Sequence, residues 1–121
     1  MEGMLGVSDL RSLVERLSCF SGVRKSDLRQ GDWVLVQTRN STYTIYCLGE
    51  DLYSVSGGWF DRKGLAPATT TINGCTWGGH VIHTGIVAAR GLFLEFGNKV
   101  VTTRIQDIRV FRREEQPQAV N

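Results

Sequence analysis

The sequence predicts a mainly β domain, a small antiparallel barrel preceded by one N-terminal helix. Three observations support this fold class. From Gly31 onward, apolar and polar residues alternate in short runs, and turn residues separate these runs at intervals of roughly ten residues. The chain also has 14 glycines but only 2 prolines, as a fold with many tight turns requires. With 121 residues, 41% of them hydrophobic, we expect one domain over residues 1–111.

The two ends of the chain predict a helix and a tail. Ser8 suits the N-cap position of an amphipathic helix over about residues 8–20. Its apolar face would consist of Leu10, Leu13, Val14 and Leu17. We expect this helix to close one end of the domain's own core, with partner binding as the alternative. The polar residues 112–121 predict a disordered tail.

Two β-hairpins are the clearest local predictions. The first joins residues 32–38 and 42–49, and the second covers residues 91–105 with a turn at Gly97–Asn98. Further strands are predicted over 51–60, breaking at Gly57–Gly58, over 68–74, with a tight turn at Asn73–Gly74, and over 105–111. Residues 80–89 fit a strand, a loop or a short helical turn.

Two segments resemble a known class of small domains. Leu28–Val36 (LRQGDWVLV) and Val100–Val110 (VVTTRIQDIRV) resemble the first and last strands of SH3-like or Sm-like small β-barrels. The resemblance covers about half of the chain, lies at the level of the fold and includes no family motif. It therefore implies a closed small barrel and assigns no functional residue.

The densest chemical stretch is Asn73–Gly85 (NGCTWGGHVIHTG). Cys75, His80 and His83 are its candidate metal ligands, but a structural zinc site needs a fourth ligand. On a strand, residues three apart also point to opposite faces, so the two histidines would diverge. A thiol nucleophile at Cys75 would need a base and an electropositive setting. We therefore expect no bound metal and no cofactor, and a metal-dependent or thiol-dependent enzyme is our third hypothesis.

The leading hypothesis is a non-enzymatic binding or assembly module whose partner is a protein, including a second copy of the chain. The candidate binding surface consists of Trp59, Trp77, Gly78, Gly79, His80 and His83, where tryptophans adjoin Gly-Gly pairs. Self-association would use an exposed apolar patch or a free strand edge, with residues 34–38, 92–96 and 98–103 as edge candidates.

A nucleic-acid-binding small barrel is the second hypothesis. Exposed aromatic rings on a sheet can stack with bases, and the candidate rings are Trp33, Tyr43, Tyr46, Tyr53, Trp59, Phe60 and Trp77. The candidate phosphate contacts are spread along the chain and are Arg24, Lys25, Arg39, Arg62, Lys63, Arg104, Arg109, Arg112 and Arg113. The net charge of +2 is too balanced to indicate such a partner by itself.

The composition also predicts a location. The N-terminal residues do not match a secretory signal, and no apolar run is long enough to span a membrane, so no membrane partner is expected. The three cysteines, Cys19, Cys47 and Cys75, are an odd number without a CxxC spacing. Reduced thiols in a cytoplasmic protein are the simplest interpretation.

Overall fold

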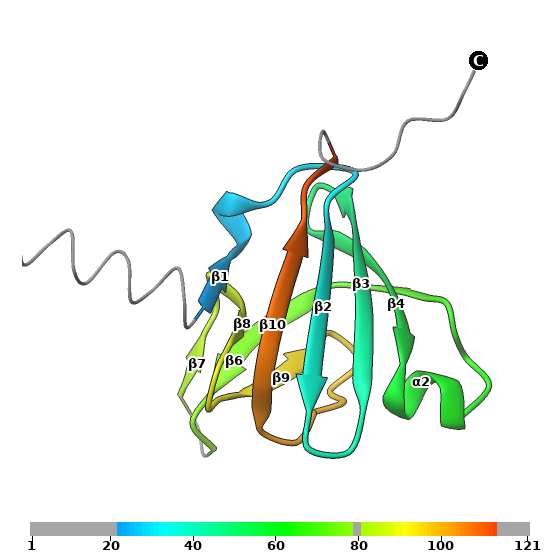
Figure 1. The fold of residues 1–121 in the computed structure, drawn as a ribbon, viewed down its shortest axis with the longest axis vertical. Helices are drawn as coiled ribbons and strands as arrows, with labels where there is room; N and C mark the ends of the chain where they lie inside the picture. Colours follow the sequence, from blue (N-terminus) through cyan, green and yellow to red (C-terminus); the bar gives the residue numbers. More distant parts are fainter. Residues whose placement is uncertain (1–21, 79–80, 114–121) are drawn as a thin grey trace, which may run out of the picture.

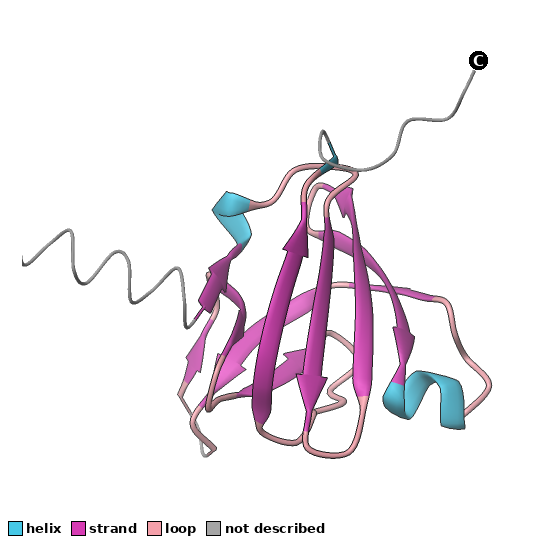
Figure 2. Ribbon diagram, in the orientation of Figure 1, coloured by secondary structure: helices cyan, strands magenta, loops and turns pink. Residues whose placement is uncertain are grey.

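The computed structural model describes residues 22–78 and 81–113, which form antiparallel β-sheets with short helical segments (Figure 1, Figure 2). The strands are β1 (Gly22–Arg24), β2 (Trp33–Thr38), β3 (Thr42–Gly49), β4 (Leu52–Gly57), β5 (Ala68–Thr70), β6 (Ile72–Thr76), β7 (Ile82–His83), β8 (Ile86–Ala89), β9 (Phe93–Phe96) and β10 (Ile105–Phe111). The 3-10 helix η1 (Lys25–Asp27) follows β1, and the helix α2 (Gly58–Arg62) follows β4. The mainly β prediction is confirmed. No helix in the described ranges is long and apolar enough to cross a membrane.

The largest sheet has the strand order β10-β2-β3-β4-β5. Its centre is the predicted hairpin of β2 and β3, which is confirmed. Every second side chain of these strands is buried, so Val34 and Ile45 face the core. Trp33 and Tyr46, one position removed from them, lie on the outer face. Because β2 is paired on both sides, the prediction that residues 34–38 form a free edge is wrong.

Two smaller sheets, β7-β6-β9 and β1-β8, complete the described fold. The predicted closed barrel is not found, because none of the three sheets in this part of the chain closes on itself. The reason lies at Thr71, which separates β5 from β6 within a segment predicted as a single strand. β5 pairs with β4 and ends the large sheet, whereas β6 pairs with β7 and β9. The helix predicted over residues 8–20 lies outside the described residues.

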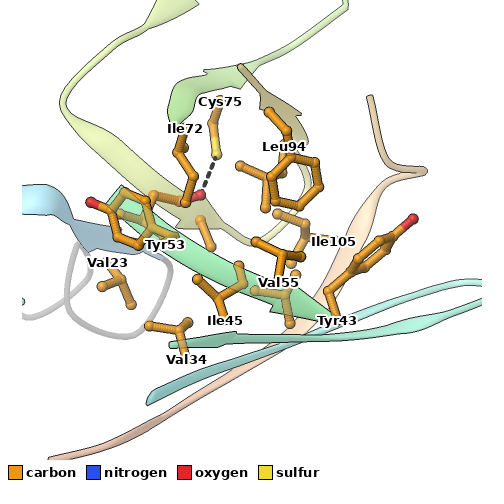
Figure 3. Close-up of a cluster of buried hydrophobic side chains, with 14 of the residues drawn as sticks. Val23, Val34, Tyr43, Ile45, Tyr53, Val55, Ile72, Cys75, Leu94 and Ile105 are labelled. Carbon is orange, nitrogen blue, oxygen red and sulfur yellow. Dashed lines mark hydrogen bonds between the residues drawn. The ribbon is translucent and has the colours of Figure 1, made fainter. Parts of the chain in front are cut away.

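The core lies between the five-stranded sheet and the sheet of β6 and β9 (Figure 3). Figure 3 shows Ile45 and Val55 of the large sheet pointing toward Ile72, Cys75 and Leu94 of the smaller one. The largest fully buried side chains include Phe60, Phe96, Ile45, Ile72, Leu94 and Ile105. Burial of this apolar surface is what holds the two sheets face to face.

The structure also decides the second predicted hairpin and the segment over residues 80–89. The turn at Gly97–Asn98 is confirmed: the Phe96 N–H donates to the Val100 carbonyl at 2.9 Å. The return arm of this hairpin is a single bridge between Glu95 and Val101 and not a full strand. Residues 80–89, for which the sequence left three structures open, include β7 and β8.

The carboxylate of Asp32 joins the start of β2 to the end of β10. It is buried and accepts hydrogen bonds from the backbone N–H groups of Arg29 and Arg113, both at 2.9 Å. The guanidinium of Arg112 donates to it at 3.1 Å. Arg112 and Arg113, which the sequence assigns to the tail, thus take part in the fold, while residues 114–121 lie outside the described residues. Burial raises the pKa of Asp32, but these hydrogen bonds outweigh it and hold the pKa below its usual value.

We predict that Asp32→Asn lowers the free energy of unfolding by about 1–3 kcal/mol at pH 7, because the amide cannot satisfy all of these donors. Because the folded pKa is depressed, the carboxylate stabilises the protein above its unfolded pKa of about 3.9. That stabilisation is lost as the pH falls through the folded pKa, so the difference in free energy of unfolding between wild type and variant should become smaller there. Urea denaturation at several pH values measures this difference.

The matched control is Asp51→Asn, which removes a half-exposed carboxylate that pairs with Lys25 at 2.9 Å. An exposed ion pair contributes at most about 1 kcal/mol. Equal stability of wild type and Asp32→Asn at pH 7 would contradict the role given to Asp32.

Candidate functional site

The segment Asn73–Gly85 forms the end of β6, the whole of β7 and the connection between them. The predicted tight turn at Asn73–Gly74 is wrong, because both residues lie inside β6. Gly74 has a φ of +140°, and a Cβ atom there would lie 2.3 Å from the His83 carbonyl oxygen. The pairing of β6 with β9 is irregular between Ile72 and Gly74. The Asn-Gly pair is therefore a bulge that lets β7 approach closely, and not a reversal of the chain.

Asn73 is held in place at this bulge. Its side-chain amide donates to Glu95 Oε2 at 2.7 Å and to the Phe96 carbonyl at 3.1 Å. Both acceptors lie on β9, so Asn73 ties the irregular part of β6 to the neighbouring strand. Glu95 is thereby used in a structural contact on the outer side of the small sheet.

Cys75 lies in the core, as Figure 3 shows. Its thiol donates to the Val87 carbonyl oxygen at a sulfur–oxygen distance of 3.4 Å. Burial raises the pKa of this thiol to about 12. Since the thiolate is the form that attacks substrates and binds metals, this setting opposes both kinds of chemistry.

The three residues singled out as metal ligands have different surroundings. Cys75 is buried, whereas His83, its register partner on β7, is exposed. His80 lies outside the described residues, as does Gly79. In the ranges 22–78 and 81–113, no three His, Cys, Asp or Glu side chains are grouped so that they could hold a metal ion.

The most exposed apolar side chains of the described chain lie at the end of the β6–β7 hairpin. Thr76 pairs with Ile82, so Trp77 and Val81 continue the two strands beyond their last pair. Both side chains are 67% exposed. Gly78 has a φ of +99°, and its N–H donates to Thr76 Oγ1 at 3.1 Å, which fixes the start of the connection.

This hairpin end is continuous with β9 and the segment before β10. A Cβ atom at Gly78 would lie 3.3 Å from the Phe93 ring, so the ring packs against the bare glycine backbone. The guanidinium of Arg104 lies over the Phe93 ring, 5.2 Å from its centroid. We call Trp77, Gly78, Val81, Phe93 and Arg104 the hairpin-end surface.

Trp59, the other tryptophan of the predicted surface, lies elsewhere. It belongs to α2 and packs edge-on against Phe60 with a centroid separation of 5.3 Å. In Figure 1, α2 and the β6–β7 hairpin lie at opposite sides of the molecule. The structure thus brings Trp77, Gly78 and His83 onto one hairpin and separates Trp59 from them.

A second group of rings lies on the outer face of the five-stranded sheet. Trp33 lies opposite Tyr46 on β3 and opposite Phe111 on β10, so the three rings form one row across the sheet. The Trp33 and Tyr46 centroids are 4.6 Å apart. Arg109 projects from the same face of β10 and helps to line a shallow depression there with Phe111. The other strand tyrosines considered as base-stacking residues, Tyr43 and Tyr53, are buried in the core, as is Phe60.

Sequence reasoning missed Val81 and Phe93 of the hairpin-end surface, and it considered Arg104 only as a phosphate contact. Only Val81 carried a local signal, since it lies in the segment Asn73–Gly85 between two histidines. Phe93 and Arg104 reach this surface through the pairing of β6 with β9 and through a cation–π contact. The residues next to Phe93 and Arg104 in the sequence indicate neither contact.

Comparisons with protein-family models, curated proteins and solved structures give no significant match to this chain. The site is therefore interpreted from its own geometry.

We predict that Cys75 resists alkylation in the folded protein at pH 8, because its thiol is buried and its pKa is raised to about 12. Iodoacetamide treatment with peptide mass spectrometry should show Cys75 unmodified in buffer and modified in urea. Cys47, which is also buried with a raised pKa, is the internal comparison. Rapid labelling of Cys75 in buffer would show an accessible thiolate and would favour thiol chemistry.

Proposed function

We propose that the protein is a non-enzymatic binding module that contacts a protein partner, including a second copy of itself, through the hairpin-end surface. The observation that carries this proposal is the pair Trp77 and Val81, two large apolar side chains that are both 67% exposed at one hairpin end. Exposed apolar side chains gathered at one place are typical of protein-binding sites, and tryptophan is among the commonest interface anchors.

The surroundings of this pair support a binding role. Gly78 keeps the backbone bare beside Trp77, and the Phe93 ring packed against it extends the apolar surface. Arg104 adds a cation at the margin, as interfaces with an apolar centre and a polar rim have. A symmetric dimer would use the same surface on both copies.

The proposal of a non-enzymatic function rests on where the reactive groups lie. Cys75, the only nucleophile that sequence analysis singled out, is buried and protonated, and His83 is exposed on the neighbouring strand. The two free thiols of the described chain, Cys47 and Cys75, also support our proposal of a cytoplasmic protein. Kinship with SH3-like or Sm-like domains stays a prediction at the level of the fold.

We predict that Trp77→Ala weakens self-association by about tenfold or more, because it removes the central apolar anchor. Sedimentation velocity over a range of protein concentrations measures the change. Leu65→Ala is the matched control, since Leu65 is 52% exposed in the loop after α2, away from the hairpin end. A wild-type protein that stays monomeric at its highest soluble concentration would contradict self-association.

Single-stranded nucleic acid is the second candidate partner, and the outer face of the five-stranded sheet favours it. The row of Phe111, Trp33 and Tyr46 offers rings on which bases can stack. Arg109, whose side chain is 71% exposed, adds a cation on the same face. Asp107 is the carboxylate beside it, and its charge is balanced by contacts with Arg90 and Arg109.

If this second function holds, Trp33→Leu should weaken binding of a fluorescein-labelled single-stranded oligonucleotide by about five- to hundredfold, the effect of losing one stacked base. Fluorescence anisotropy measures binding, and the affinity of the wild type should fall as salt rises. Trp77→Leu, on the other surface, should bind like the wild type. The absence of any binding at low salt would exclude this partner.

A further inference from the structure

A cleft with a volume of about 600 Å³ lies at one end of the five-stranded sheet, and two arginines are among the residues that line it. The residues that line it are Arg39, Asn40, Thr103, Arg104, Ile105 and Gln106. The strand pairing explains how they meet. Ile105, near the start of β10, pairs with Thr38, the last residue of β2. The β2–β3 turn and the segment that enters β10 therefore lie side by side and form the two walls.

The charges in this cleft are unbalanced. Arg39 and Arg104 line it, and among the residues that the structure describes no carboxylate does. Two arginines elsewhere in the described chain do face a carboxylate: Arg90 contacts Asp107 at 2.8 Å, and Arg112 contacts Asp32 at 3.1 Å. Two guanidinium groups on facing walls without a carboxylate create a local positive potential that attracts anions.

Hydrogen bonds order the turn that forms one wall, and a cation–π contact orients Arg104 on the other. On the turn wall, the Thr38 N–H donates to the Ser41 carbonyl at 2.8 Å, and the Ser41 N–H donates to Thr38 Oγ1 at 3.2 Å. Arg62 of α2 donates to Ser41 Oγ at 3.2 Å and brings a third cation to the same turn. On the strand wall, Arg104 lies over the Phe93 ring, which limits the directions in which its guanidinium can point.

We propose that this cleft binds a phosphate group, with Arg39 and Arg104 as the charged ligands and with Asn40, Thr103 and Gln106 as further hydrogen-bond donors. A phosphate presents at least three acceptor oxygens in different directions, which matches donors on two walls. A carboxylate presents two oxygens in one plane and is satisfied by a single guanidinium. The proposal goes beyond the protein-binding function and does not depend on it.

The test is a titration of the full chain, labelled with ¹⁵N, with inorganic phosphate followed by NMR. We expect saturable shifts of the amide signals of Asn40 and of residues 103–106. Arg39→Gln and Arg104→Gln should each weaken binding by about tenfold, the effect of losing a charge-assisted hydrogen bond.

Arg24→Gln is the matched control, because it removes the same charge from an exposed arginine on β1, outside the cleft. It should leave the affinity for phosphate unchanged. Shifts that grow without saturation, or equal weakening by Arg24→Gln and Arg39→Gln, would overturn the proposal, since both indicate only general charge attraction. Acetate that binds as tightly as phosphate would overturn the preference for phosphate.

Two further titrations identify the source of the phosphate. A nucleoside monophosphate carries a terminal phosphate, and a single-stranded oligonucleotide without terminal phosphates carries only bridging phosphates. Tighter binding of either one, with loss in Arg39→Gln, supports the site and names the source, whereas failure of both to shift these amides contradicts it. Trp77→Ala should still bind phosphate, and Arg39→Gln should keep the oligomeric state of the wild type, so failure of one proposal leaves the other standing.

Discussion

The carboxylate of Asp32 organises one end of the five-stranded sheet. The carboxylate accepts hydrogen bonds from the backbone N–H of Arg29 before β2 and from that of Arg113 after β10. The backbone carbonyl of Asp32 accepts a hydrogen bond from the Cys47 N–H on β3 at 2.9 Å. One buried residue thus connects the loop that enters the sheet, the central hairpin and the last strand. Because β10 joins the five-stranded sheet only through β2, the row of Trp33 and Phe111 at this end of the two strands depends on this connection.

The parts of the fold that the sequence predicted are those governed by local pattern. Alternation of apolar and polar residues identified β2 and β3, and Gly97–Asn98 marked a turn correctly. The closed barrel was wrong because the chain changes sheets at Thr71, inside a run that looks like one strand. The tight turn predicted at Asn73–Gly74 was wrong because Asn-Gly suits both a tight turn and a bulge, and only the long-range contact with β7 decides between them.

The candidate site was predictable to the extent that its residues share one hairpin. Trp77 was placed on the candidate surface because it adjoins a Gly-Gly pair, and in the structure it is 67% exposed. The cysteine and the histidines suggested metal or thiol chemistry by residue type. In the structure Cys75 is buried on β6, whereas His83 is exposed on the neighbouring strand β7. Sequence reasoning considered Arg39 and Arg104 among many basic residues as phosphate contacts, but only the pairing of β2 with β10 brings these two together in one cleft.

The bare backbone at Gly74 has a consequence for how the strands find their partners. The space opposite the His83 carbonyl accepts a residue without a Cβ atom, and the two neighbours of Gly74 both carry one. Slippage of β6 by one residue along β7 would place Asn73 or Cys75 against that carbonyl, and it would also turn the buried face of β6 outward. A single glycine thereby excludes the nearest misfolded alternatives, and it keeps Cys75 inside and Trp77 at the exposed end of the hairpin.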